Sequence, residues 1–242
     1  MRKAVLVIGS TGLIGRHITD GLLSDGQLVV GVSKANTKEA NVLFESENYM
    51  HCSCDILTDL NLSCVIEYLS QLEIEITGLV YACRDRNLLN GINTSNDDWV
   101  NEFKLAVVAP YNLIQSLVLN HPVESIVFLS SIYGVVAQKP ELYDDPITSL
   151  NPHYGCAKAA ALQLVRDLAV SLAPTCKVNS LVLGGMDHEV DPMLRAKYSQ
   201  FTPEKRMLDP NHVYGSVRFL LGSDSTGLNG STVIQDGGWT AW

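Results

Sequence analysis

The chain has 242 residues, of which 46% are hydrophobic, and its formal net charge at pH 7 is −9. This length fits one large domain or two small ones with a sizeable core. No basic run exceeds the two residues of Arg2-Lys3, which argues against a nucleic-acid partner because binding nucleic acid requires clustered Lys and Arg. No apolar stretch is long enough to span a membrane, and the apolar run 4–9 is too short for a signal-peptide core. We therefore expect a cytoplasmic protein.

Short aliphatic runs alternate with longer amphipathic ones along the chain. The strand-like runs are 4–8, 28–32, 50–54, 79–82, 126–129, 178–183 and 232–234, and the helix-like runs are 16–25, 37–46, 60–72, 97–120, 152–173 and 211–222. Continuous aliphatic strands separated by helices indicate a parallel sheet covered on both faces. The pattern predicts one doubly wound α/β domain over residues 1–242. The segment 186–210 is the least periodic, and we expect it to form a mobile substrate flap.

The first strand-like run leads into a glycine-rich turn with the spacing G-x-x-G-x-x-G. One glycine allows a tight turn, one lets the backbone approach a pyrophosphate, and one lets the helix pack close to the strand. The N-terminus of the following helix offers free N–H groups to phosphates. We therefore expect a bound dinucleotide to contact this turn, which comprises Gly9, Ser10, Thr11, Gly12, Leu13, Ile14 and Gly15.

The end of the second strand-like run bears on which dinucleotide is bound. NAD sites carry an acidic residue there and NADP sites carry basic ones, whereas this chain has Ser33-Lys34. Lys34 is either a solvated lysine in a loop or part of a pocket for the 2′-phosphate, and we expect NADP, with NAD as the alternative. After the third strand, Asp55 either accepts a hydrogen bond from the adenine amino group or caps the next turn, and Ile56 lies beside it.

The cysteines and histidines form no metal-binding pattern. Six cysteines lie at positions 52, 54, 64, 83, 156 and 176, and the six histidines are scattered. Cys52 and Cys54 are separated by one residue, which is not the spacing of a zinc knuckle. We expect reduced, buried thiols and no metal.

Tyr154 and Lys158 lie four residues apart in a segment rich in alanine and leucine, so they share one face of the predicted helix. Polar tips on a face that packs against a core need partners. One interpretation is a Lys158 that snorkels to solvent and a Tyr154 at a wet edge. The other is a tyrosine whose proton is made available by the adjacent cation, which favours the phenolate.

Four further motifs follow the glycine turn in order: LVYAC at 79–83, IVFLSSIYG at 126–134, YGCAK at 154–158 and DGGW at 236–239. With them, the chain resembles the short-chain dehydrogenase/reductase family over nearly its whole length. The resemblance implies a single-domain Rossmann fold with a seven-stranded, mainly parallel sheet, assembled as a homodimer or homotetramer. It also implies transfer of hydride between a nicotinamide cofactor and a carbonyl or alcohol.

The resemblance also implies roles for particular residues. Tyr154 would be the general acid/base, and Lys158 would hold the nicotinamide ribose and favour ionisation of Tyr154. Ser131, with Ser130 as its neighbour, would polarise the substrate carbonyl. Further cofactor contacts are implied for Tyr81, Ala82, Cys83, Gly184 and Met186.

Three positions depart from the family's pattern. Arg84 replaces a glycine after the fourth strand, and it either reaches toward substrate or covers the cofactor. Ala106 aligns with the family's helix-borne catalytic asparagine, so a water or another side chain must organise the proton relay, or the activity is low or absent. Leu183-Gly184 replaces a Pro-Gly pair, which removes the rigidity of the proline.

The segment 134–152 joins the strand that bears Ser131 to Tyr154, so we expect it to line the substrate crevice. Its polar side chains either suit hydroxyl groups or form a solvated surface loop; they are Gln138, Lys139, Glu141, Tyr143, Asp144, Asp145, Thr148 and Asn151. Together with Arg84 and His188, they favour a hydroxylated, anionic, sugar-type substrate.

A narrower similarity to oxidoreductases of bacterial surface-sugar pathways, such as those of flagellin glycan and nonulosonic acid, favours the same substrate class. The segment YDDPITSLNPHYG at 143–155 carries part of this similarity. Two alternatives stay open: a reductase of fatty or other small ketones, and a catalytically weak dinucleotide-binding module.

Overall fold

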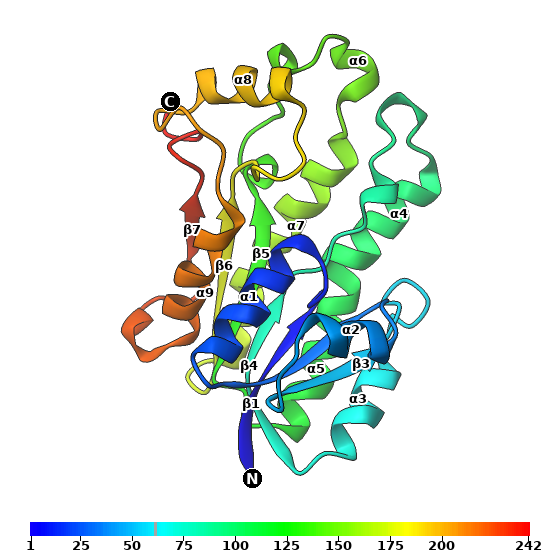
Figure 1. Ribbon diagram of the computed structural model, residues 1–242, viewed down its shortest axis with the longest axis vertical. Helices are drawn as coiled ribbons and strands as arrows, with labels where there is room; N and C mark the ends of the chain where they lie inside the picture. The colour runs from blue at the N-terminus through cyan, green and yellow to red at the C-terminus, as the bar shows by residue number, and fades with distance from the viewer. Residues whose placement is uncertain (61) are drawn as a thin grey trace.

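The computed structural model describes residues 1–60 and 62–242, and it contains a seven-stranded sheet (Figure 1). The strands are β1 (Arg2–Ile8), β2 (Leu28–Ser33), β3 (Tyr49–Ser53), β4 (Ile74–Tyr81), β5 (Ser125–Ser131), β6 (Lys177–Leu183) and β7 (Thr232–Gln235). They are hydrogen-bonded in the order β3-β2-β1-β4-β5-β6-β7, and every pairing is parallel. The predicted doubly wound α/β domain is confirmed. The strand order reverses between β1 and β4, and such a switch point is where doubly wound sheets bind ligands.

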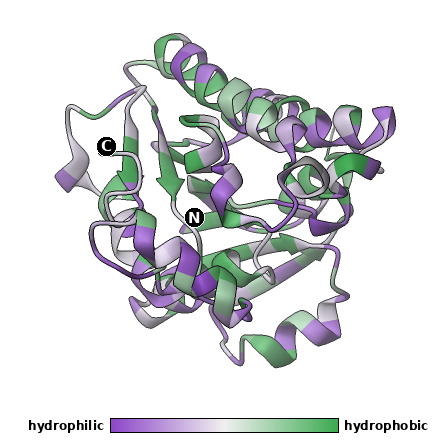
Figure 2. Ribbon diagram, turned by 90° about the horizontal axis from the view of Figure 1, so that it is seen from above, coloured by the Kyte–Doolittle hydropathy of each residue, from purple (hydrophilic) through white to green (hydrophobic). Residues whose placement is uncertain are grey.

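Helices cover both faces of this sheet (Figure 2). They are α1 (Leu13–Ser24), α2 (Thr37–Leu43), α3 (Ser63–Ser70), α4 (Asn96–Phe103), α5 (Ala109–Asn120), α6 (Pro146–Ser149), α7 (Pro152–Leu172), α8 (Pro192–Phe201) and α9 (Val213–Leu221). In β1, Leu6 and Ile8 share a core cluster with α3, α5 and α7, whereas Val5 and Val7 share one with α1 and α9, because successive side chains of a strand point to opposite faces. Residue 61, within the predicted helix 60–72, lies outside the described residues. Among the helices that are described, none is long and apolar enough to cross a membrane.

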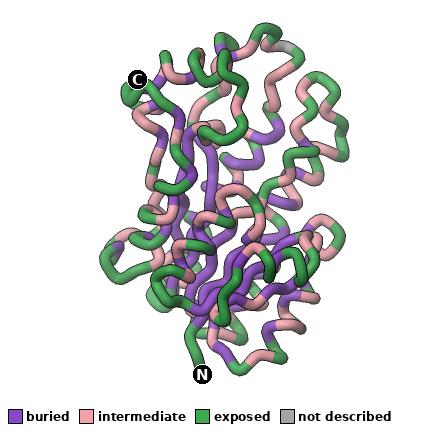
Figure 3. Tube along the Cα trace, viewed as in Figure 1, coloured by how far each residue is buried: buried purple, intermediate pink, exposed green. Residues whose placement is uncertain are grey.

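The strands at the centre of the sheet are buried on both faces (Figure 3), whereas no position of the edge strand β7 is fully buried. β5, for example, is buried at every position. The sequence predicts the fourth strand at 79–82, but β4 begins at Ile74. Because Glu75 and Thr77 alternate with Ile74 and Ile76, the first half of this strand has no continuous aliphatic run.

The helical segment predicted at 97–120 is interrupted. α4 ends at Phe103, a π-helical turn spans Lys104–Val108, and α5 begins at Ala109. Pro110 lies in the first turn of α5; in a regular α-helix its ring would clash with the carbonyl of Ala106, to which it also offers no N–H. The wider turn relieves this conflict, and such π-bulges are frequent at functional sites.

α6 and α8 lie beyond the carboxyl ends of the strands (Figure 1). α8 belongs to the segment 186–210, so the predicted flap is helical over part of its length. The side chain of Asp191 caps the start of α8, and Tyr198 stacks on Trp239 with ring centroids 4.3 Å apart. These contacts attach the segment to the last turn of the chain; its mobility stays a prediction.

Candidate active site

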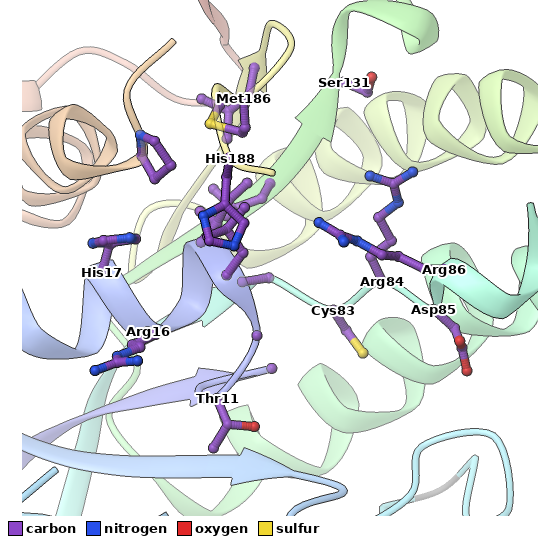
Figure 4. A pocket seen from close by; sticks show the side chains of 18 of the residues that line it. Thr11, Arg16, His17, Cys83, Arg84, Asp85, Arg86, Ser131, Met186 and His188 are labelled. Atoms are coloured by element: carbon purple, nitrogen blue, oxygen red, sulfur yellow. The ribbon is translucent and has the colours of Figure 1, made fainter. Parts of the chain in front are cut away.

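A cleft of about 1410 Å³ opens at the carboxyl ends of the strands. Its walls come from the turns that follow six of the strands and from α7, and Figure 4 shows many of the lining side chains. The sequence-predicted residues on these walls are Gly9, Thr11, Gly12, Leu13, Ile14, Ser33, Lys34, Ile56, Ala82, Cys83, Ser131, Tyr154, Lys158, Gly184 and Met186. Parallel strands end at one edge of a sheet, and this brings together residues that are far apart in the chain.

The glycine turn forms a close-packed cradle in this cleft. Gly9 has a φ of 86°, and a Cβ on it would lie 2.9 Å from the carbonyl oxygen of Ala82. A Cβ on Gly15 would clash with the carbonyl of Gly9, so glycine is required for α1 to start this close to β1. No side chain caps α1 at Gly12, and its first turn has no acidic residue. The N–H groups there suit a pyrophosphate, so the cradle fits the expected dinucleotide.

Four residues predicted to contact the cofactor lie behind the cleft wall instead: Ser10, Gly15, Asp55 and Tyr81. Ser10 is fully buried, with its Oγ 3.2 Å from the Oη of Tyr49. Asp55 accepts a hydrogen bond from the N–H of Leu57 at 3.0 Å, which is the turn-capping alternative. Tyr81 donates to the carbonyl of Leu105 at 2.7 Å. The bonds of Ser10 and Tyr81 hold these two side chains away from the cleft, whereas Asp55 stays beside the cleft-lining Lys34, 3.4 Å from its Nζ.

Lys34 is held by two carboxylates where β2 ends. Its Nζ lies 3.0 Å from Oδ2 of Asp85 and 3.4 Å from Oδ2 of Asp55. Partial burial lowers the pKa of Lys34, but the hydrogen bond and charge of Asp85, with the charge of Asp55, raise it by more. The Oγ of Ser33 lies 3.0 Å from Nε2 of His51. Both residues predicted to hold a 2′-phosphate therefore already have partners within the protein.

Ser131, Tyr154 and Lys158 share one wall of the cleft, where their side chains are largely buried. Each is no more than 8% exposed. The ammonium of Lys158 donates to the carbonyl of Leu129 at 3.4 Å and lies 5.8 Å from the centre of the Tyr154 ring. Gly134 permits this arrangement, because a Cβ on it would lie 2.9 Å from the backbone of Lys158. Burial of both groups favours the acid/base interpretation over a lysine that snorkels from a wet edge.

Arg84 lies over the same tyrosine. Its Cζ is 4.8 Å from the centre of the Tyr154 ring, and Arg86 and His188 also line the cleft (Figure 4). In the described part of the chain, no carboxylate lies within ion-pair distance of Arg84. Its charge is therefore available to a ligand beside the phenol.

The turn after β6 is held in place without the proline. The N–H of Gly185 donates to the Oη of Tyr198 at 2.7 Å, and Met186 forms a parallel bridge with Leu208. The N–H of Leu208 also donates to the carbonyl of Gly185 at 2.9 Å. These bonds fix the backbone beside Gly184 and supply the rigidity that the missing proline would have given.

The polar side chains of the segment 134–152 do not line the cleft, so that prediction is wrong. They bond to neighbouring protein groups instead. Asp144 pairs with Lys197 at 2.6 Å, and the side chain of Gln138 exchanges two hydrogen bonds with the backbone of Asn151. The segment therefore supports the site from outside, and its polarity gives no information about the substrate.

The structure brings together a group of possible metal ligands that the spacing did not indicate. The ligand atoms of Cys54, Asp59 and Cys64 lie within 4.8 Å of one another. However, Asp59 already accepts hydrogen bonds from Ser63 and from the N–H of Cys64. Burial raises the pKa of both the Cys54 and the Cys64 thiols. Protonated thiols are poor metal ligands; the absence of a metal stays a prediction.

Comparison with known proteins shows which family the chain belongs to. Residues 10–240 match the sequence family described as enoyl-(acyl carrier protein) reductase. The chain belongs to this family of short-chain dehydrogenases/reductases. It is an NAD(P)-dependent oxidoreductase, and the sequence-based resemblance is confirmed.

Relatives and similar folds span nearly the whole of this reductase. The post-translational flagellin modification protein A of Campylobacter coli is 26% identical, over 98% of each chain. Sorbose reductase sou1 of Schizosaccharomyces pombe is 27% identical, over 98% of this chain and 95% of its own. A short-chain dehydrogenase of Leptospira borgpetersenii with bound NAD+ has a TM-score of 0.83 at 22% identity, covering 99% and 93% of the two chains. A gluconate 5-dehydrogenase of Burkholderia cenocepacia in complex with NADP and tartrate has the same TM-score at 21% identity, covering 100% and 96%.

Sequence reasoning missed two carboxylates near the site of this reductase. Asp85 pairs with Lys34, and nothing local in the sequence connects residues 51 positions apart. Glu102 is 1% exposed on α4. A signal for Glu102 existed, because it lies on the same helical face as Trp99 and Phe103, where an apolar residue is usual.

Proposed function

We propose that this reductase catalyses the NADP(H)-dependent interconversion of a carbonyl and an alcohol on a hydroxylated, anionic, sugar-type substrate. The observation that carries the proposal is the guanidinium of Arg84, 4.8 Å from the centre of the Tyr154 ring. An anionic group held by Arg84 would place the rest of the substrate beside the phenol. Charge-assisted contacts of this kind are among the strongest that fix a ligand's orientation.

Ser131, Tyr154 and Lys158 perform the proton transfer. In reduction, Tyr154 gives its proton to the carbonyl oxygen, to which Ser131 also donates a hydrogen bond. The buried charge of Lys158 stabilises the phenolate that remains. A bound nicotinamide supplies hydride to the carbon or accepts it in the reverse direction.

Two kinds of observation support the sugar-type substrate. Arg84, Arg86 and His188 place three basic side chains around the cleft. The names of a flagellin-modification protein and a sorbose reductase among the relatives agree with a polyhydroxylated substrate.

NADP is the proposed cofactor, with Lys34 as the ligand of the 2′-phosphate. Lys34 would exchange its contacts with Asp55 and Asp85 for the phosphate, and surface ion pairs are weak enough to permit this exchange. NAD is the alternative, because the same two carboxylates suit ribose hydroxyls when Lys34 stays paired.

A reductase of fatty or other small ketones is the second candidate. The family's description as enoyl-(acyl carrier protein) reductase favours it, as do Ile132, Val190 and Leu194 in the cleft lining. A weak dinucleotide-binding module is the third, and the intact Ser131, Tyr154 and Lys158 argue against it.

The test is NADPH consumption with keto-sugars that carry a carboxylate or phosphate, with neutral keto-sugars and with apolar ketones. Arg84→Gln should raise KM for the anionic substrates by roughly 10- to 100-fold, the value of a charge-assisted contact, and spare the neutral ones. Arg166→Gln, on the exposed face of α7, is the matched control. Turnover of apolar ketones alone, independent of Arg84, would overturn the sugar proposal and leave the second candidate.

We also propose that the protein acts in the cytoplasm as a homodimer or homotetramer. Val100, Val108 and Tyr111 are exposed along the α4–α5 segment, and apolar side chains grouped in this way suit a protein interface. Light scattering of the unmutated protein and of Tyr111→Arg would test it. An unmutated protein that is monomeric at working concentration would contradict the proposed homodimer or homotetramer.

A further inference from the structure

Glu102 is an interior carboxylic acid with one oxygen left unpaired. It lies in the last turn of α4 and is 1% exposed. Among the described residues, no hydrogen-bond partner reaches its Oε2. An ionised carboxylate is costly in such a place, and titratable groups in these surroundings cluster at functional sites.

Charged groups from two elements act on Glu102. Lys158 and His153 face it from α7, and Arg84 and Asp85 face it from the segment after β4. Burial raises the pKa of Glu102; Lys158, followed by His153 and Arg84, lowers it in part. In the described part of the chain, no ion pair shorter than 4.0 Å joins Glu102 to these groups. Lys158 and His153 therefore act on Glu102 through their charge rather than through a direct ion pair.

Lys158 needs a proton source on the side of its ammonium that faces α4. Tyr154 loses a proton in every reduction, and both residues are more than nine-tenths buried, so a protein group beside them is a suitable source of the replacement. Ala106, which the helix presents near Lys158, has no polar side chain. Glu102 lies four residues earlier, in the last turn of α4 before the π-helical turn that contains Ala106.

His153, which is fully buried, is the next polar group on this route. Its Nε2 lies 2.7 Å from the carbonyl oxygen of Leu88; a carbonyl can only accept, so Nε2 carries the hydrogen and Nδ1 holds a lone pair. Nδ1 is buried, and no partner for it is found in the described residues. The ring lies 5.7 Å from that of Trp99, which is partly exposed.

We propose that Glu102 is a positioning residue that passes protons between His153 and Lys158, an inference that rests on the proposed function. In reduction, the O–H bond of Tyr154 breaks and its proton goes to the substrate oxygen, while the substrate carbon gains hydride from the cofactor. The phenolate regains a proton from the Lys158 ammonium through water, and the amine takes one from the Glu102 carboxyl. The carboxylate regains one from solvent by way of His153. Each cycle consumes one hydride and one solvent proton and restores all the protein groups.

The first test does not depend on turnover. Infrared difference spectra of the cofactor-free protein at increasing pH should show the C=O stretch of a protonated carboxyl that Glu102→Gln removes. In Lys158→Met, the midpoint of this titration should move to higher pH, because a cation that favours the carboxylate is gone. If no band depends on Glu102, or if its midpoint is unchanged in Lys158→Met, the coupling is overturned whatever the activity.

The second test is the pH profile of kcat. Glu102→Gln keeps the size of the side chain but cannot exchange a proton, so kcat should fall roughly 10- to 100-fold, less than for loss of the general acid itself. KM and the Kd for NADPH should change little, the limb of the profile that depends on Glu102 should disappear, and Glu102→Asp should restore part of kcat. Glu67→Gln, exposed on α3, is the matched control.

The outcomes separate the two proposals. A folded Glu102→Gln protein with an unchanged kcat and pH profile overturns the role of Glu102. If the unmutated protein turns over no carbonyl substrate, the proposed function fails, and the infrared titration still decides whether Glu102 and Lys158 are coupled.

Discussion

Lys34 and Lys158 line the same cleft in opposite surroundings. The side chain of Lys34 is 54% exposed and lies within 3.4 Å of two carboxylates. Lys158 is 7% exposed, and within the described residues it forms no ion pair. A charge that only binds a ligand can stay solvated and loosely paired until the ligand arrives, because such pairs are weak. A charge that acts on a reacting group is most effective when buried and not neutralised, because its field is stronger in a low dielectric.

The largest expected effects lie at the buried lysine, Lys158, and at its neighbour Tyr154. Tyr154→Phe should lower kcat by roughly two to four orders of magnitude, the range for a lost general acid, and should leave the Kd for NADPH nearly intact. Lys158→Met should weaken both binding and turnover, since the proposed function gives its charge a role toward a bound cofactor as well as toward the phenol. Steady-state kinetics and fluorescence titration with NADPH measure the two effects. A Tyr154→Phe protein that kept most of its turnover would assign the acid to another residue.

At the exposed end, Lys34→Asp should reduce or reverse the preference for NADPH over NADH by roughly 10- to 100-fold, the value of one charge-assisted contact to the 2′-phosphate. Asp85→Asn should act in the opposite direction, because it frees Lys34 from its nearest partner. Titration of each variant with both cofactors measures these changes. Equal affinity of the unmutated protein for NADPH and NADH would refute the role of Lys34.

The carboxyl groups near the two lysines should also differ in how they make the stability of the fold depend on pH: Glu102 near Lys158, and Asp85 beside Lys34. Burial raises the pKa of Glu102, so the folded protein holds this proton more tightly than the unfolded chain does. Its contribution to stability is therefore present below the unfolded pKa, about 4.3, and is lost as pH rises through the folded pKa. Glu102→Gln should raise Tm at pH 8 by on the order of a few degrees, and the difference should shrink toward low pH.

Asp85 should show the opposite sign. Burial raises its pKa, but hydrogen bonds from Asn87 and Lys34, with the charge of Lys34, lower it by more. Its contribution is present above the unfolded pKa and is lost as pH falls through the folded one. Urea unfolding of Glu102→Gln and Asp85→Asn across pH measures both signs. If the free energy of unfolding of the two variants depended on pH in the same way, the contrast between Glu102 and Asp85 would be wrong.

The smallest effect is expected outside the cleft. Asp144 is largely exposed and pairs with Lys197, so Asp144→Ala should change the free energy of unfolding by less than about 1 kcal/mol. Because the residue does not line the cleft, kcat/KM should stay the same for every substrate. A clear loss of activity toward keto-sugars would return the segment 134–152 to the substrate site.

Local signals in the sequence were sufficient for much of the architecture. Aliphatic runs located all seven strands, because most strands have an uninterrupted aliphatic stretch at their centre; the exception was the first half of β4, where Glu75 and Thr77 break the run. The glycine spacing located the cradle, because the clash that excludes a side chain at Gly9 or Gly15 arises within one turn and its neighbouring strand. The four-residue spacing of Tyr154 and Lys158 placed both on one wall for the same local reason.

The sequence by itself therefore determined the fold, the family and the face of α7 that carries the chemistry, since each depends on periodicity or on spacing within one element. Only the tertiary structure decided which partners the charged groups have. It paired Asp85 with Lys34, it buried Glu102 without an ion-pair partner among the described residues, and it turned the polar side chains of 134–152 away from the cleft and toward partners such as Lys197. These pairings join segments far apart in the chain. Their energies depend on distance and burial after packing, and no pattern in the sequence records either quantity.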